Sequence, residues 1–209
     1  PTNFNSSPIH AIIDLALLKG DFEPRKIFKL SRRNPELMQD VFVAGYPFGK
    51  RISASVKVTK GIVSSLTGIG NNFSNIQIDA AFQPGNNGGP ILGDKGNVIG
   101  VALAKLDLKK VVKKWEVVPE NTNFGIKTSV VRNLLQGNNV TIPATNTKKF
   151  DRSELGRMIS VGTYYLSCCM TMAQIEKMRA SKVIFSDNII IILLNCSNSI
   201  DFSDWDPDS

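Results

Sequence analysis

Short apolar runs, separated by Gly, Pro, Asn and Asp, recur along the chain from Ala11 to about Val140. This alternation, with no helical period before residue 128, is typical of all-β sandwiches and barrels. The expected strands cover residues 11–19, 40–47, 54–66, 75–82, 89–93, 97–106 and 123–127. The GDKGN segment at 93–97 predicts a tight hairpin turn, because glycine supplies a positive φ.

A helical period first appears at residues 128–137, TSVVRNLLQG. Thr128 or Ser129 is expected to cap this helix, and Gly137 to end it. Its apolar face would consist of Val130, Val131, Leu134 and Leu135. The helix is therefore predicted to close a β-domain.

The remaining chain has a different character. Residues 138–151 lack periodicity and are rich in Asn, Thr and Pro, which predicts a linker. Beyond it we expect a strand at 162–168, a Met-rich helix at 171–180 and a solvated acidic tail at 201–209. The apolar run Ile189–Leu194 is too short to span a bilayer, so it is interpreted as a buried strand.

Composition narrows the function classes. With 209 residues and 42% hydrophobic content, the chain can bury a globular core, so disorder is not expected. The net charge of +7 comes without a nucleic-acid motif, and no nucleic-acid partner is predicted. Cys168, Cys169 and Cys196 match no zinc spacing, and neither a metal nor a cofactor is predicted. No signal peptide is visible, but a chain that starts at Pro1 leaves its true start open.

The segment Gly85–Pro90, GNNGGP, has the composition of a catalytic turn. A glycine-rich turn between strands can aim successive backbone N–H groups at one point, as an oxyanion hole requires. Phosphate cradling needs similar glycines, but the Gly-Lys-Ser/Thr sequence and a following helix are both missing.

In its surroundings, QIDAAFQPGNNGGPILGDKGNVIGVALA at 77–104 resembles the active-site region of the trypsin-like serine peptidases, especially the HtrA/Deg group. The likeness extends from Asp14 to Leu135, through DLALLK, VFVAGYPFG, VTKGIVSSL and NFGIKTSVVRNLL. It implies an all-β fold of two perpendicular β-barrels with the active site between them. We expect a remnant of the first barrel at 1–38, the second barrel at 39–142, and a small α+β extension at 143–209 of unknown role.

The same resemblance assigns residues to roles. Asp14 matches the triad aspartate, and Asn87 stands where the family has its nucleophilic serine. The only histidine, His10, would lie about 13 Å along an extended strand from Asp14, too far for a hydrogen bond. An amide has no hydroxyl for a base to activate, so acyl-enzyme chemistry cannot start at Asn87. The oxyanion donors would be the N–H groups of Gly85 and Asn87, and Asp79 would be structural.

The resemblance also outlines a specificity pocket without an acidic residue at its base, which favours small or medium apolar side chains. Its expected framing residues are Ala81, Phe82, Leu103, Ala104, Lys105, Asn123 and Gly125.

Three hypotheses for function remain open. The first is a proteolytically inactive HtrA/Deg-like domain that still binds peptide or a partner protein. The second is an active serine endopeptidase, seen as a fragment or variant without its histidine segment and serine. The third is a non-catalytic scaffold module built around residues 146–209. The family implies proteolysis in protein quality control and a periplasmic or extracytoplasmic location. Oligomerisation stays open.

Overall fold

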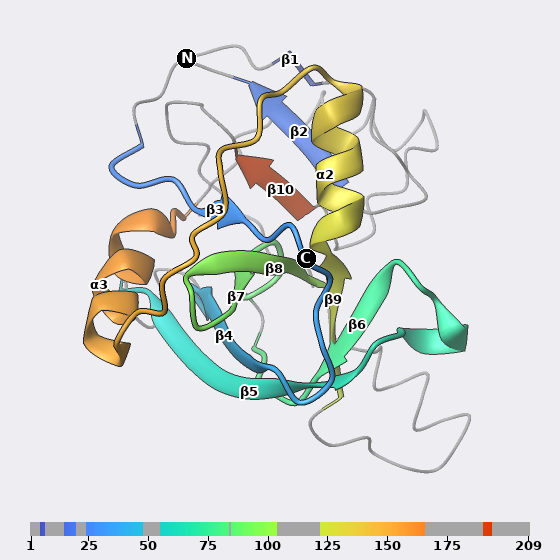
Figure 1. Cartoon of the computed structure of the whole chain (residues 1–209), viewed down its shortest axis with the longest axis vertical. Coiled ribbons are helices and arrows are strands. Elements are labelled where there is room, and N and C mark those ends of the chain that lie inside the picture. The colour runs from blue at the N-terminus through green and yellow to red at the C-terminus, as the bar shows by residue number, and fades with distance from the viewer. Residues whose placement is uncertain are drawn as a thin grey trace, which may run out of the picture.

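The computed structural model describes residues 5–6, 15–19, 24–47, 55–83, 85–103, 122–165 and 190–193. Most strands belong to one sheet, ordered β3-β8-β7-β4-β5-β6-β9, in which β8 also pairs with β9 (Figure 1). The strands are β3 (Lys29–Leu30), β4 (Asp40–Gly45), β5 (Lys57–Ser65), β6 (Asn75–Ile78), β7 (Pro90–Leu92), β8 (Asn97–Leu103) and β9 (Asn123–Lys127). The β8–β9 pairing closes β4 to β9 into an antiparallel barrel, as the trypsin-like prediction requires.

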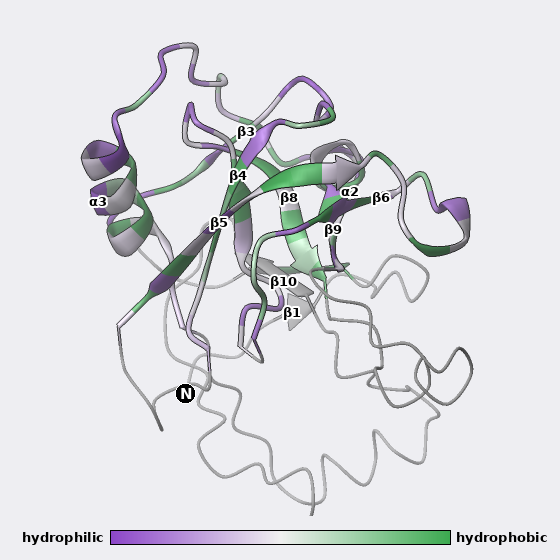
Figure 2. Cartoon of the chain, turned by 90° about the horizontal axis from the view of Figure 1, so that it is seen from below, coloured by the Kyte–Doolittle hydropathy of each residue, from purple (hydrophilic) through white to green (hydrophobic). Residues whose placement is uncertain are grey.

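Alternation along the strands explains why the barrel has two apolar layers. Val41 and Val43 of β4 lie in one buried cluster, whereas Ala44 lies in another. The first cluster also holds Ile76, Ile78, Ile91 and Ile99, and the second lies against the helices. β8 serves both layers, so nearly all of it is buried and most of it is coloured hydrophobic in Figure 2. Period-2 patterning thus specifies the register of these strands.

Helix α2 (Thr128–Gly137) has the predicted bounds and buries Val131, Leu134 and Leu135. The predicted side-chain cap was wrong. The N-cap residue is Lys127, and no side chain accepts a hydrogen bond there. The Thr128 hydroxyl is buried and donates instead to the carbonyl of Val98 at 2.9 Å, which ties the helix to β8.

The hairpin turn between β7 and β8 is confirmed. Gly96 has φ +64°, and the Gly93 N–H donates to the Asn97 carbonyl at 3.0 Å. A short 3-10 helix, Ile69–Asn71, precedes β6.

The segment after α2, predicted as a linker, packs back along the barrel. Asn97 and Asn146 exchange two hydrogen bonds of 2.9 and 2.8 Å, and the Thr145 hydroxyl donates to the Leu30 carbonyl at 2.9 Å. Helix α3 (Arg152–Gly162) follows, and no period in the sequence had predicted it. A capping box begins it: the Glu154 N–H donates to the Asp151 carboxylate at 2.8 Å, which lowers the pKa of Asp151.

The strand predicted at 162–168 was wrong in its described part. Gly162 ends α3, and Thr163 is its C-cap in an extended conformation without a strand partner among the described residues. The helices α2 and α3 lie well apart on the outside of the barrel (Figures 1 and 2). The predicted Met-rich helix at 171–180 and the tail at 201–209 are outside the described residues. The domain boundaries at 39 and 143 stay a prediction.

A second, small sheet joins β1 (Asn5–Ser6), β2 (Leu15–Lys19) and β10 (Ile190–Leu193). β10 pairs in parallel with β2, from Ile190 beside Leu15 to Leu193 beside Leu18. The predicted strand at 189–194 is thus confirmed as a strand. Leu15 and Leu17 are buried. Strand β10 of the same chain therefore pairs with the strand that follows Asp14.

Candidate active-site loop

The glycine-rich turn lies between β6 and β7 and is held by backbone hydrogen bonds. The Asn86 N–H donates to the Gln83 carbonyl at 3.0 Å, and the Gly89 N–H donates to the Asn86 carbonyl at 2.9 Å. Two further bonds fasten the turn to β8, from Gly88 N–H to the Ala102 carbonyl at 2.9 Å and from Ala102 N–H to the Gly89 carbonyl at 2.8 Å. The turn therefore has a defined shape on the barrel.

Two positions in the turn require glycine. Gly85 has φ +98° and Gly88 has φ +75°, angles that L side chains rarely adopt. A Cβ at Gly85 would also meet the Tyr46 carbonyl oxygen directly. The Tyr46 N–H in turn donates to the Gly85 carbonyl at 3.2 Å. The end of β4 thus fixes the turn from the opposite side to β8.

Both predicted oxyanion donors lie in this turn. Asn87 is exposed, whereas its neighbour Asn86 is only 2% exposed. Within the part of the chain that the structure describes, the backbone N–H groups of Gly85 and Asn87 donate to no acceptor. The Asn86 side chain accepts from the Gln83 N–H at 3.2 Å, so Asn86 is a structural member of the turn.

Of the other predicted site residues, some are buried in the core, some are exposed, and some lie outside the described residues. Asp79 is structural, since its carboxylate accepts from the Ile62 N–H at 2.6 Å. Phe82 is 2% exposed and packs in the cluster with Ile78, while Ala81 is exposed. Asp14, His10, Ala104 and Lys105 lie outside the described residues.

β9 contributes two of the predicted pocket residues. Asn123 is 1% exposed and donates to the Ala80 carbonyl at 2.7 Å, while its Oδ1 is buried with no partner among the described residues. A Cβ at Gly125 would meet the end of the Ile91 side chain, so Ile91 would have to shift to admit a larger residue there. Leu103 pairs with Phe124 at the end of β8. Asn123, Gly125 and Leu103 are therefore placed together by the closing β8–β9 and β6–β9 pairings.

Sequence reasoning missed Tyr46. Its hydroxyl donates to the Thr163 carbonyl at 2.9 Å, and its ring meets that of Tyr165 edge-on, with centroids 5.7 Å apart. Burial, and then the nearby Tyr164, raises the pKa of Tyr46 above its ordinary value. The residue therefore joins the C-terminal segment to the turn at Gly85. The only signal in the sequence was an aromatic residue inside GYPFG.

The described part of the chain holds no group of three or more His, Cys, Asp or Glu residues that could bind a metal ion. None of its helices has the length and apolar composition that crossing a bilayer requires.

Comparison with known proteins supports a family assignment. Residues 3–101 match the model of a trypsin-like peptidase domain. Together with Do-like relatives, this match supports the assignment of the chain to the trypsin-like peptidases, in the HtrA/Deg-like, or Do-like, group.

Three relatives define the extent of the similarity. Protease Do-like 2, chloroplastic, of Arabidopsis thaliana is 41% identical over 134 residues, covering 58% of this chain and 20% of that protein. The serine protease Do-like HtrB of Bacillus subtilis is 32% identical over 125 residues, which cover 56% of this chain and 26% of that protein. The uncharacterized protein y4bJ of Sinorhizobium fredii is 35% identical over 156 residues, which cover 74% of this chain and 25% of that protein. The chain thus spans about a quarter or less of the length of these relatives.

Proposed function

We propose that this chain is an HtrA/Deg-like domain that binds polypeptide without cleaving it. The observation that carries the proposal is an exposed Asn87 in a turn that is held on both sides. The family resemblance puts the nucleophilic serine at this position. A carboxamide cannot form an acyl-enzyme, because it has no hydroxyl from which a base can take a proton. Loss of a triad nucleophile removes about six orders of magnitude of turnover in a comparable enzyme.

Retention of the turn supports the binding half of the proposal. The N–H groups of Gly85 and Asn87 are backbone groups, so the side chain at position 87 does not determine whether they can bind a carbonyl oxygen. Neither group donates to an acceptor within the described segments. A peptide carbonyl can therefore occupy this position without any covalent step. An extracytoplasmic location is part of the same proposal and follows only from the family.

Two assays test the two halves separately. Cleavage of casein is measured for the chain and for Asn87→Ser, and we expect no turnover by the unmodified protein. Turnover by the unmodified protein would overturn the inactive assignment, while turnover only by Asn87→Ser would support a preserved site around a lost nucleophile.

Binding is measured by fluorescence anisotropy with labelled, reduced and carboxymethylated polypeptide. We expect saturable binding that Asn87→Ser leaves unchanged, because the backbone donors remain. Absence of binding at every concentration tested would refute the binding half. The far-UV circular dichroism of both proteins provides the control for folding.

A further inference from the structure

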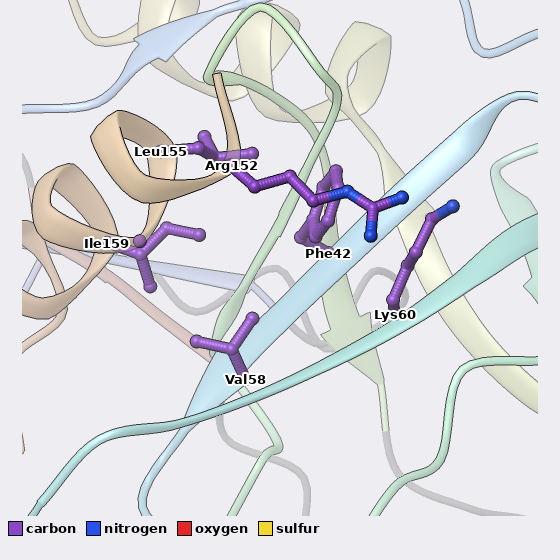
Figure 3. Close-up of a pocket in the computed structure, with 7 residues that line it drawn as sticks. Phe42, Val58, Lys60, Arg152, Leu155 and Ile159 are labelled. Carbon is purple, nitrogen blue, oxygen red and sulfur yellow. The ribbon is translucent and has the colours of Figure 1, made fainter. Parts of the chain in front are cut away.

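A cavity of about 290 Å³ lies between α3 and the strands β4 and β5 (Figure 3). No residue of the turn at 85–90 lines it. Its walls are mainly apolar. Phe42 and Val58 line it from the strands, and Leu155 and Ile159 line it from α3. Leu155 and Ile159 are 3% and 1% exposed, so they also anchor the helix to the barrel.

One of the residues that line the cavity from α3 is a glycine. Gly156 lines the cavity, and a Cβ built there would meet no atom within 4 Å. Val58 on the facing strand remains 43% exposed, which is unusual for a valine beside a packed helix. Glycine weakens a helix relative to any ordinary residue, so a side chain at 156 would both strengthen α3 and fill the space.

Two cations stand at one side of the cavity. In Figure 3 the Arg152 guanidinium extends from the start of α3 toward the side on which Lys60 lies. Lys60 forms an ion pair with Asp40 at 2.9 Å. Arg152 forms no ion pair within the described segments.

The carboxylates near this side of the cavity do not cancel its charge. Asp40 neutralises only Lys60. On α3 itself, Asp151 and Glu154 each accept a backbone N–H from the other in the capping box. An anion that enters beside Arg152 therefore meets a guanidinium that pairs with no carboxylate of the described residues, and a charge-assisted hydrogen bond can form there.

We propose that this cavity binds a small amphipathic carboxylate, with an aromatic or branched apolar body of about ten non-hydrogen atoms. The volume sets the size: a cavity of 150 Å³ holds benzene, and drug-sized ligands need roughly 300 Å³ or more. The apolar body lies between Phe42 and Leu155, and the carboxylate points to Arg152. The bound ligand contacts both α3 and the barrel and so stabilises the packing of the helix. This stabilisation is independent of polypeptide binding at the turn.

The test uses 3-phenylpropionate as the probe, with the whole chain, in NMR titrations. The efficiency of small ligands per atom places the expected Kd at about 0.1–5 mM. The neutral analogue 3-phenylpropan-1-ol should bind about threefold to tenfold more weakly, because it cannot pair with the guanidinium. Propionate, which lacks the apolar body, should not bind measurably. Equal binding of acid and alcohol, or no binding of the acid, would overturn the proposal.

Variants locate the site. Gly156→Leu fills the cavity and should weaken binding of 3-phenylpropionate by at least tenfold, while the protein stays folded. Gly137→Leu is the matched control, since Gly137 is also helical and a Cβ there also meets nothing within 4 Å, but it lies on α2. Arg152→Gln should remove most of the preference for acid over alcohol.

Gly156→Leu should leave polypeptide anisotropy binding unchanged, which separates this proposal from the function of the turn. Unchanged 3-phenylpropionate affinity in a folded Gly156→Leu protein would show that the probe does not occupy this cavity.

Discussion

Replacement of Gly85 by alanine tests whether the end of β4 fixes the shape of the active-site-like turn. At φ +98° an alanine is outside the left-handed region that L residues reach, and its Cβ would meet the Tyr46 carbonyl oxygen. Such backbone strain costs about 1–3 kcal/mol. If the turn moves to avoid the contact, it loses the hydrogen bond from Tyr46 N–H, which contributes about 1 kcal/mol. We expect Gly85→Ala to lower the free energy of unfolding by about 2–4 kcal/mol in total.

Gly70→Ala is the matched control for this substitution. Gly70 also has a positive φ, but its +63° lies inside the left-handed region, and no atom lies within 4 Å of a Cβ there. Its cost should be only that of the left-handed conformation, about 1–2 kcal/mol. The difference between the two variants therefore measures the contact with β4 together with the less favourable φ of Gly85.

Urea unfolding of the three proteins, followed by far-UV circular dichroism, measures this difference. Polypeptide anisotropy binding in the folded range should fall for Gly85→Ala and stay unchanged for Gly70→Ala, because only the first displaces the N–H groups of the turn. Equal losses of stability in the two variants would refute the argument that Tyr46 and Gly85 are packed against one another.

Three further substitutions have defined outcomes. Lys57→Met should raise the free energy of unfolding in urea by about 1–3 kcal/mol, since the buried ammonium nitrogen of Lys57 meets no partner among the described residues; a loss of stability would contradict this. Thr163→Val should raise the melting temperature by a few degrees for the same reason, because its buried hydroxyl is unpaired within the described chain. Tyr46→Phe should make stability less sensitive to alkaline pH. The folded pKa of Tyr46 lies above 10.0, so the unfolded state ionises first and wild-type stability falls as pH rises from about 10 through that pKa. Urea unfolding at pH 9 and pH 11 measures the difference, and parallel declines in both proteins would refute the assignment.

The barrel could be predicted from the sequence because its strands repeat a simple alternation. Val41, Val43 and Ile78 lie on one side of the pleat with polar or outward-facing neighbours between them, and such a pattern admits one register. The two-residue strand β3 carries no such pattern. Its position depends on the pairing of Lys29 and Leu30 with β8, which no local signal encodes.

Helix α3 was missed for a different reason. Asp151 and Glu154 have the spacing of a capping box, and this signal was present in the sequence. The helix buries only Leu155 and Ile159 among large apolar residues, so its apolar face is too narrow to stand out as a period. A search for capping boxes alone would have found its start.

The site shows what a local motif can and cannot predict. The glycines of the turn were identified from the sequence, and the structure gives Gly85 and Gly88 the positive φ values that make glycine necessary. The support of the turn could not be predicted, because Tyr46 and Ala102 are remote in sequence and contact it only through the fold.

The long-range contacts of Lys26 and Tyr46 can form only late in the synthesis of this protein. The Lys26 N–H donates to the Tyr164 hydroxyl across 138 residues, and Tyr46 reaches Thr163 across 117. At about 5–20 residues per second, the ribosome needs roughly 7–28 s to make the 138 residues that separate the first pair. During that interval Lys26 has been made but Tyr164 has not. The first part of the chain therefore cannot complete these two contacts until α3 and the residues that follow it have been synthesised.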